Sequence, residues 1–115
     1  MTNNCSVSQK QYQNVFYDAE HLWFWFISSR NMQNGFRNTN RNMQRPCELL
    51  DIEILVTQLY LSGRLSVSEL EVIKKYGEMK RCPNQYMWNE NRDAALWLSA
   101  MRSIGTAARS RGWIE

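Results

Sequence analysis

The residues that could support acid–base or nucleophilic chemistry are few and widely separated in this chain. His21 is the single histidine, which excludes a multi-histidine metal site and a His–His acid–base pair. It stands beside the most apolar stretch of the chain, where we expect a hydrogen-bonded histidine near the start of a helix. The sequence contains no Walker A, GxGxxG or HExxH pattern. We therefore expect no enzymatic activity, no metal and no cofactor.

The cysteines do not form a recognisable redox or metal motif. Cys5, Cys47 and Cys82 fall in no CxxC or Cys/His spacing, and an odd number of cysteines without a signal peptide favours free thiols in a reducing compartment. The polar first ten residues lack the apolar core of a secretion signal. The longest apolar run, residues 22–27, is far too short to span a bilayer. These features predict a cytoplasmic protein without a membrane segment.

The charged residues are clustered along the chain, although the formal net charge is only +3. Residues 28–47 contain four arginines and no acid, whereas residues 48–71 contain five acids and one arginine. Residues 74–111 contain eight basic residues and three acids. Such blocks are typical of faces that meet a polyanion or an oppositely charged partner. A solvated surface with clustered charges is the alternative.

Three groups of basic residues are candidates for contacts with nucleic acid. The first lies in a loop rich in Asn and Arg, the second at the end of the third expected helix, and the third on the last helix. Arginine supplies forked donors that suit phosphates and base edges. The candidate ligands are Arg37, Arg41, Arg45, Lys74, Lys75, Lys80, Arg81, Arg102 and Arg109.

The chain divides into a flexible tail over residues 1–13 and a single helical domain over residues 14–115. The first helix is expected to begin at Asp18, a good N-cap, and to run to about Gln33. Residues 22–27 are apolar for nearly two turns, so this helix is not cleanly amphipathic. It is either a central helix covered by its neighbours or a partner-binding patch, and a short buried strand is the other local interpretation.

Helix signals also delimit three further elements. Pro46 opens the second helix, with Glu48 and Asp51 in its positive first turn, and Gly63 ends it. A Ser66–Glu69 capping box starts the third helix, which Gly77 is expected to stop. The fourth helix runs from Asn89 or Glu90 to Arg111.

The predicted fold is therefore all-α. It is a small bundle of about four helices, with a helix-turn-helix-like hairpin around Gly63 and a mobile Asn/Arg-rich loop over residues 34–45. The residues expected in the core are Trp23, Phe26, Leu55, Leu59, Ile73, Trp97 and Met101.

Residues 65–77, LSVSELEVIKKYG, resemble the opening helix of the promoter-reading domain of bacterial sigma factors. Residues 95–111 are loosely similar to the DNA-contacting final helix of that domain, although the scaffold helix that precedes it has no counterpart between Gly77 and Glu90. The whole chain is also similar to a small family of bacterial helical proteins. Residues that carry this similarity are Asp18-Ala19-Glu20, Trp23 to Phe26, Arg45 to Glu48 and Arg111-Gly112. The two resemblances imply a bacterial helical protein of regulatory type.

Two functions follow as expectations. The first is a bacterial regulatory protein that binds nucleic acid, most simply DNA, through the basic residues named above. The second is a protein-interaction module, such as an adaptor, an inhibitor or a subunit that contacts the transcription machinery. Its anchors would be exposed aromatics among Trp25, Tyr86, Trp88 and Trp113. The oligomeric state stays open at this stage.

Overall fold

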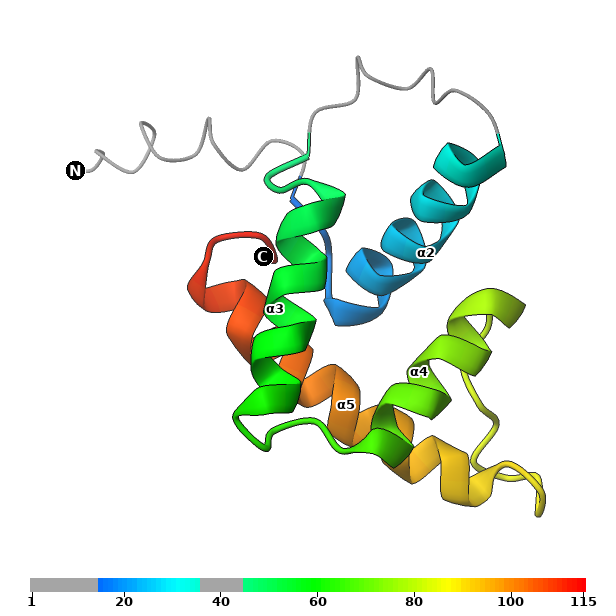
Figure 1. The fold of residues 1–115 in the computed structure, drawn as a ribbon. Coiled ribbons are helices and arrows are strands. Elements are labelled where there is room, and N and C mark those ends of the chain that lie inside the picture. The colour runs from blue at the N-terminus through cyan, green and yellow to red at the C-terminus, as the bar shows by residue number, and fades with distance from the viewer. Residues whose placement is uncertain (1–14, 36–44) are drawn as a thin grey trace.

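The computed structural model describes residues 15–35 and 45–115, and these residues fold into helices (Figure 1). In chain order the helices are α2 (Ala19–Gly35), α3 (Leu49–Leu61), α4 (Val67–Met79) and α5 (Asn91–Ser110). The all-α prediction is confirmed. The predicted tail over residues 1–13 and most of the predicted Asn/Arg-rich loop lie outside the described residues.

None of the helices in the described part of the chain is both long enough and apolar enough to cross a bilayer.

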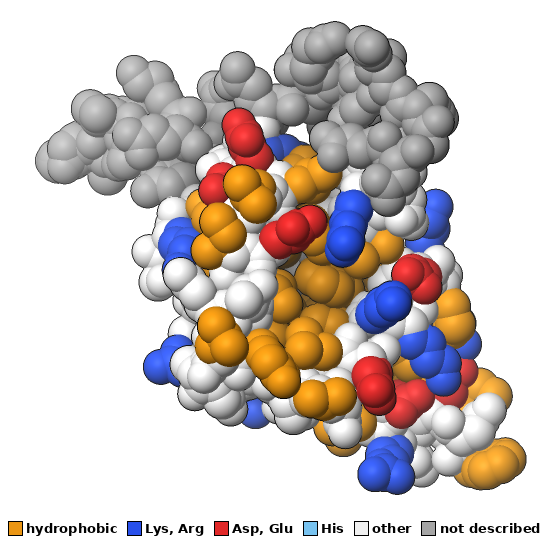
Figure 2. All heavy atoms as spheres, viewed as in Figure 1, with side chains coloured by type: hydrophobic (Ala, Val, Ile, Leu, Met, Phe, Trp, Pro, Cys, Tyr) orange, Lys and Arg blue, Asp and Glu red, His pale blue; other side chains and the backbone are white. Residues whose placement is uncertain are grey.

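Helices α2 and α5 form the centre of the fold, because each of them contacts all three of the other helices. They meet at Gly105 of α5, where an added Cβ would lie 3.5 Å from the Cβ of Ala19. Helices α3 and α4 flank this central pair and diverge from each other (Figure 1). Figure 2 shows hydrophobic side chains gathered in the hollow between them.

The aromatic run of α2 belongs to the core. Trp23 and Phe26 are buried, while Phe24 packs on Trp97 of α5 with ring centroids 5.6 Å apart. Trp25 packs on the ring of Phe16, which precedes the helix, with ring centroids 5.2 Å apart. Of the three interpretations that the sequence left open, the structure supports a central helix covered by its neighbours.

The remaining core follows the expected helix faces. All seven predicted core residues are buried, namely Trp23, Phe26, Leu55, Leu59, Ile73, Trp97 and Met101. Phe16, which precedes α2, joins them with no exposed surface. Its backbone N–H donates to the carbonyl oxygen of Trp113 at 2.9 Å, and its own carbonyl accepts from the N–H of Glu115 at 3.1 Å. These bonds tie the segment before α2 to the segment after α5.

Local capping interactions start α2 and α4 as the sequence predicts, whereas the predicted start of the second helix at Pro46 is wrong, because α3 begins at Leu49 with Glu48 as its N-cap. The Asp18 carboxylate accepts the backbone N–H of His21 at 2.8 Å, which satisfies a donor left free by the first turn of α2. Ser66 Oγ accepts the N–H of Glu69 at 3.1 Å, and Glu69 Oε1 accepts the N–H of Ser66 at 2.8 Å. This reciprocal pair is the predicted capping box of α4.

The predicted end of the third helix at Gly77 is wrong. Helix α4 continues to Met79, and Lys80 then adopts a left-handed conformation with φ 61°. The N–H of Arg81 donates to the carbonyl of Tyr76, and the N–H of Lys80 to that of Gly77, as in a Schellman motif. Gly77 instead lies against α2, where an added Cβ would come within 2.8 Å of Trp23 Nε1. Glycine is required there for close packing.

The contact between Gly77 and α2 makes a testable prediction. Gly77→Ala should lower the free energy of unfolding by about 1–3 kcal/mol, since the new methyl group overpacks a site next to Trp23 and Ile27. The measurement is urea denaturation followed by circular dichroism. Gly105→Ala is the matched control, because its Cβ meets only the methyl of Ala19 at an ordinary contact distance. It should be neutral or stabilising by up to about 1 kcal/mol. Equal stability of the two variants would contradict the packing role of Gly77.

Candidate functional site

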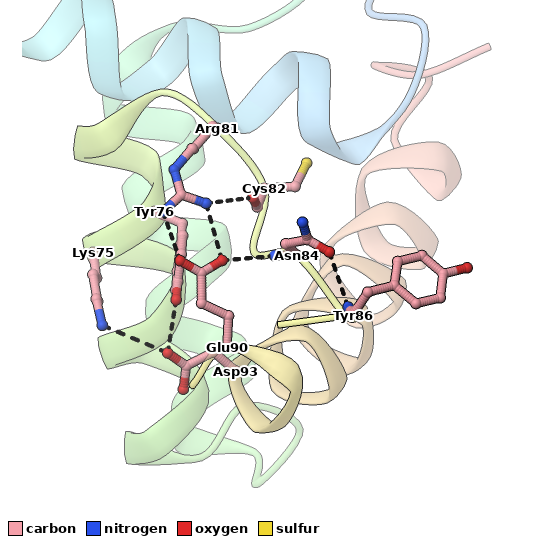
Figure 3. Close-up of polar contacts among 8 residues, drawn as sticks. All are labelled: Lys75, Tyr76, Arg81, Cys82, Asn84, Tyr86, Glu90 and Asp93. Carbon is pink, nitrogen blue, oxygen red and sulfur yellow. Dashed lines mark hydrogen bonds and ion pairs between the residues drawn. The ribbon is translucent and has the colours of Figure 1, made fainter. Parts of the chain in front are cut away.

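The loop between α4 and α5, residues 80–90, is organised around a buried carboxylate. Glu90, the residue before α5, is almost completely buried. Its two oxygens accept from the guanidinium of Arg81, Oε1 from Nη1 at 3.0 Å and Oε2 from Nη2 at 2.7 Å. A two-pronged arginine–carboxylate pair of this kind fixes orientation as well as charge. The pair therefore joins the two ends of the loop (Figure 3).

Backbone hydrogen bonds hold the loop between these ends. Pro83 cannot continue a helix, and the N–H of Asn84 donates to Glu90 Oε1 at 2.8 Å. The side-chain oxygen of Asn84 accepts the N–H of Tyr86 at 2.9 Å, which is the local turn that asparagine favours. The carbonyl of Met87 then accepts the N–H of Glu90 at 2.9 Å and leads into α5. The loop is consequently folded back on the Glu90 carboxylate.

A second carboxylate extends the same network towards α4. Asp93 Oδ2 accepts the hydroxyl of Tyr76 at 2.9 Å and lies 3.6 Å from Lys75 Nζ. The Tyr76 ring is buried and packs edge-on against Trp97, and the guanidinium of Arg81 lies 5.4 Å from its centre. Residues from α4, the loop and α5 thus share one polar cluster around the Tyr76 hydroxyl and the Glu90 carboxylate (Figure 3).

The charges of this network stabilise one another. The Arg81 hydrogen bonds, followed by the N–H of Asn84, lower the pKa of Glu90 to about 2, so this carboxylate is ionised at neutral pH. Burial, followed by the hydrogen bond to Asp93, raises the pKa of Tyr76 to about 12, so its hydroxyl stays protonated and donates. Each group is held in the protonation state that its hydrogen bonds require.

The held loop presents two large aromatic side chains to solvent. Tyr86 and Trp88 are 87% and 86% exposed, and Figure 3 shows the Tyr86 ring pointing away from the network. Among the residues that the structure describes, neither side chain takes part in a ring contact or hydrogen bond. The arrangement can bind another molecule through ring surfaces whose supporting backbone is already ordered.

Two of the predicted nucleic-acid ligands belong to this network and are engaged by acids. Arg81 is held by Glu90, and Lys75 lies beside Asp93. Lys74 is exposed at the rim of a shallow pocket between α2 and α4, which Arg30 and Glu78 also line. Lys80 is exposed at the end of α4.

The other predicted ligands lie in different places. Arg102 and Arg109 line a groove between α5 and the start of α2, which also contains Asp18 and Glu20. Arg109 Nε donates to the carbonyl oxygen of Glu115 at 3.3 Å. An anion entering this groove would meet both signs of charge. The structure therefore does not join the last-helix arginines to the lysines of α4.

Of the predicted ligands in the Asn/Arg-rich loop only Arg45 belongs to the described structure, because Arg37 and Arg41 lie outside the described residues. The Arg45 guanidinium stacks over Phe16, 4.7 Å from the ring centre, and lies 5.9 Å from that of Trp25. This position gives Arg45 a packing role near the segments that precede α2 and follow α5.

The titratable groups outside the network show ordinary structural roles. His21 Nδ1 accepts the N–H of Tyr17 at 3.0 Å, and burial, followed by the charge of Arg45, lowers the pKa of His21. Burial raises the pKa of Cys47 to about 12 and that of Cys82 to about 11. Both thiols are protonated at neutral pH. In residues 15–35 and 45–115 no three His, Cys, Asp or Glu side chains are placed to hold a metal ion.

Comparison with known proteins adds no relative. No protein-family model matches the chain, and no curated protein or solved structure is significantly similar to it.

Of the four aromatics predicted as exposed anchors, Tyr86 and Trp88 are exposed, whereas Trp25 and Trp113 are partly buried against the core. Sequence reasoning missed the groups that hold Tyr86 and Trp88. Glu90 was expected only as the start of the last helix, and Arg81 as a phosphate ligand. The available signal was charge spacing, since Glu90 is the single acid between Lys80 and Arg92. A lone acid beside a proline-containing loop is a candidate partner for the arginine that precedes the loop.

The Glu90 ion pair predicts a specific pH dependence of stability. The folded pKa of Glu90 is about 2, below the value of about 4.3 expected when unfolded. The stabilisation is therefore complete above the unfolded pKa and is lost as pH falls from there through the folded pKa. Glu90→Gln should melt below the wild type at pH 7, and the difference should narrow near the folded pKa. Thermal unfolding followed by circular dichroism measures the melting temperatures of the two proteins at pH 7 and near the folded pKa.

Glu71→Gln is the control for this measurement. Glu71 is an exposed carboxylate of α4, and no ion pair in the described residues includes it. Its substitution should leave the melting temperature nearly unchanged at both pH values. If the melting temperature of Glu90→Gln stays below that of the wild type by the same amount over this pH range, the ionised carboxylate is not what stabilises the loop.

Proposed function

We propose that this protein is a binding module without catalytic activity, which recognises a protein partner through the loop over residues 80–90. The observation that carries the proposal is the exposure of Tyr86 and Trp88 on a loop that the Arg81–Glu90 pair holds in place. Tryptophan, tyrosine and arginine supply most of the binding energy at protein interfaces. An exposed Trp–Tyr pair on an ordered backbone fits that role.

The ordered backbone matters energetically. Binding costs free energy when loops and side chains must be immobilised, and a loop that is already held avoids most of that cost. The hydrogen bonds of the loop involve the backbone of Tyr86 and not its phenol ring. Both rings can therefore enter a partner pocket without disturbing the contacts that position them.

The charges nearby favour an acidic or mixed-charge surface on the partner. Lys80, Arg81 and Arg92 surround the aromatic pair in the sequence, and Glu90 is the only acid between them. Because Glu90 is buried against Arg81, the exposed Lys80 and Arg92 are the charged residues of this stretch that a partner could meet. Charges at a rim steer association more than they add affinity.

The test compares wild-type protein with the Tyr86→Ala, Trp88→Ala double variant as immobilised baits. Proteins retained from a bacterial lysate are quantified by mass spectrometry, and binding of a purified candidate is then measured by calorimetry. The double variant should melt like the wild type and bind the partner at least about thirtyfold more weakly.

Val67→Ala is the matched control, since Val67 is an exposed apolar residue at the start of α4 that lies outside the loop. It should bind the partner as the wild type does. If the wild type and the double variant retain every protein equally, the loop is not the partner-binding surface.

We also propose, as a second function, that the protein binds nucleic acid. The same aromatic pair, Tyr86 and Trp88, favours single strands. Bases stack on exposed aromatic rings, and neighbouring cations contact the phosphates. Helices α3 and α4 are less suited to a duplex groove. The acids Asp51 and Glu53 of α3 face no basic residue on that helix, and α4 carries Glu69, Glu71 and Glu78 against Lys74 and Lys75.

Fluorescence anisotropy of a labelled single strand tests this second proposal. For about three phosphate contacts, affinity should fall at least about tenfold between about 50 and about 200 mM salt. Trp88→Ala should weaken binding at both salt concentrations, and Lys80→Ala with Arg92→Ala should flatten the salt dependence. The absence of binding by folded protein at low salt would rule this proposal out and leave the protein-binding proposal standing.

A further inference from the structure

Helix α3 has a second apolar face in addition to the one that it turns towards the core. Ile52, Leu55 and Leu59 are buried, as the inward face of an amphipathic helix should be. On the opposite side, Leu50, Ile54 and Leu61 are 62%, 46% and 75% exposed. Scattered exposed apolar residues are normal, but these three follow one line along a single helix.

The spacing on this outer face is that of a helix-pairing seam. Positions 50, 54, 57 and 61 are separated by four, three and four residues, the alternation that keeps side chains on one seam between two helices. Thr57 is the only polar member, and its hydroxyl donates to the carbonyl oxygen of Glu53 at 2.8 Å. Thr57 therefore brings no unsatisfied donor to the seam. Figure 2 shows hydrophobic side chains over α3 outside the hollow that faces α4.

The charges beside this seam are arranged so that it complements itself. Glu48 and Asp51 stand at the start of α3, and Arg64 follows its end. None of the ion pairs in the described residues involves Arg64. If two copies of α3 pack antiparallel with Leu50 opposite Leu61, each Arg64 lies near the Glu48 and Asp51 of the other copy. A parallel pair would instead bring the acids of both copies together.

We propose that this protein forms a symmetric dimer, in which the α3 helices of two copies pack antiparallel through Leu50, Ile54, Thr57 and Leu61. A two-fold interface must be self-complementary, because the same patch faces itself. The seam satisfies this requirement in both shape and charge. Ile54 of one copy lies opposite Thr57 of the other, and this layer repeats on the other side of the two-fold axis.

The expected dimer is weak. Helix α3 has 13 residues and is about 20 Å long, so four seam residues cover less than the roughly 800 Å² per partner of a standard stable interface. The dimer should therefore dissociate on dilution. This surface is separate from Tyr86 and Trp88, so the dimer does not depend on the proposed function of the loop.

The test is sedimentation velocity of the full chain from about 5 µM to about 500 µM protein. The wild type should change from monomer towards dimer over this range. Ile54→Glu and Leu61→Glu should each raise the dimer dissociation constant at least about tenfold, because they bury an unpaired carboxylate in the seam. Both positions are exposed in the monomer, so thermal unfolding of the dilute variants should match that of the wild type. Leu61→Ser provides a milder variant if either glutamate perturbs folding.

Arg64→Glu tests the orientation of the helices. It should weaken the antiparallel dimer, since it places a carboxylate beside Glu48 and Asp51 of the other copy, and would leave a parallel pair unaffected. Trp88→Ala is the control that should dimerise like the wild type. A wild type that stays monomeric at the highest concentration, or a dimer that tolerates both Ile54→Glu and Leu61→Glu, overturns the proposal. A dimer unaffected by Arg64→Glu overturns its antiparallel arrangement.

Discussion

The fold depends on one constraint, which is that α2 is apolar around most of its circumference. Residues 22–27 are all aliphatic or aromatic, so no single neighbouring helix can remove this surface from water. Helices α3, α4 and α5 each contact α2, and Phe16 covers Trp25 from the segment before it. The close approach of α4 in turn requires glycine at position 77, where the indole of Trp23 donates to the carbonyl of Ile73 at 2.8 Å. Packing around α2 thus places α4 and α5 side by side.

The contact between α4 and α5 is what creates the candidate site. The loop that joins them must reverse direction over a short distance, and its polar groups are satisfied by Glu90 and not by solvent alone. The guanidinium of the Arg81–Glu90 pair lies over the buried ring of Tyr76, which packs edge-on against Trp97, and partial exclusion of water there strengthens hydrogen bonds to charged groups. The exposed aromatics of the loop are therefore supported from the core, through Trp97, Tyr76 and the ion pair.

Three ion pairs in the described structure use charge from the basic sequence blocks, and this changes what those blocks mean. Arg30 lies 3.8 Å from Glu53, Lys75 lies beside Asp93, and Arg81 is held by Glu90. An exposed pair such as Arg30–Glu53 contributes little to stability, but all three pairs reduce the charge that a polyanion would meet. The apolar and aromatic surface is left as the more distinctive feature of the described structure. It lies on the outer face of α3 and on the loop before α5.

Features that depend on neighbours in the chain were determined by the sequence itself. The caps at Asp18 and Ser66, the helical class and the seven core positions were all predictable, because capping bonds and apolar periodicity operate within one or two turns. The tertiary structure decided features that depend on distant neighbours. Gly77 signals a helix end locally, yet α4 passes through it because α2 requires that space, and Lys80 takes the left-handed position instead. Arg81 similarly suits a phosphate when considered alone. Its partner became clear only in the fold, because an ion pair across a loop depends on where two helices are brought together.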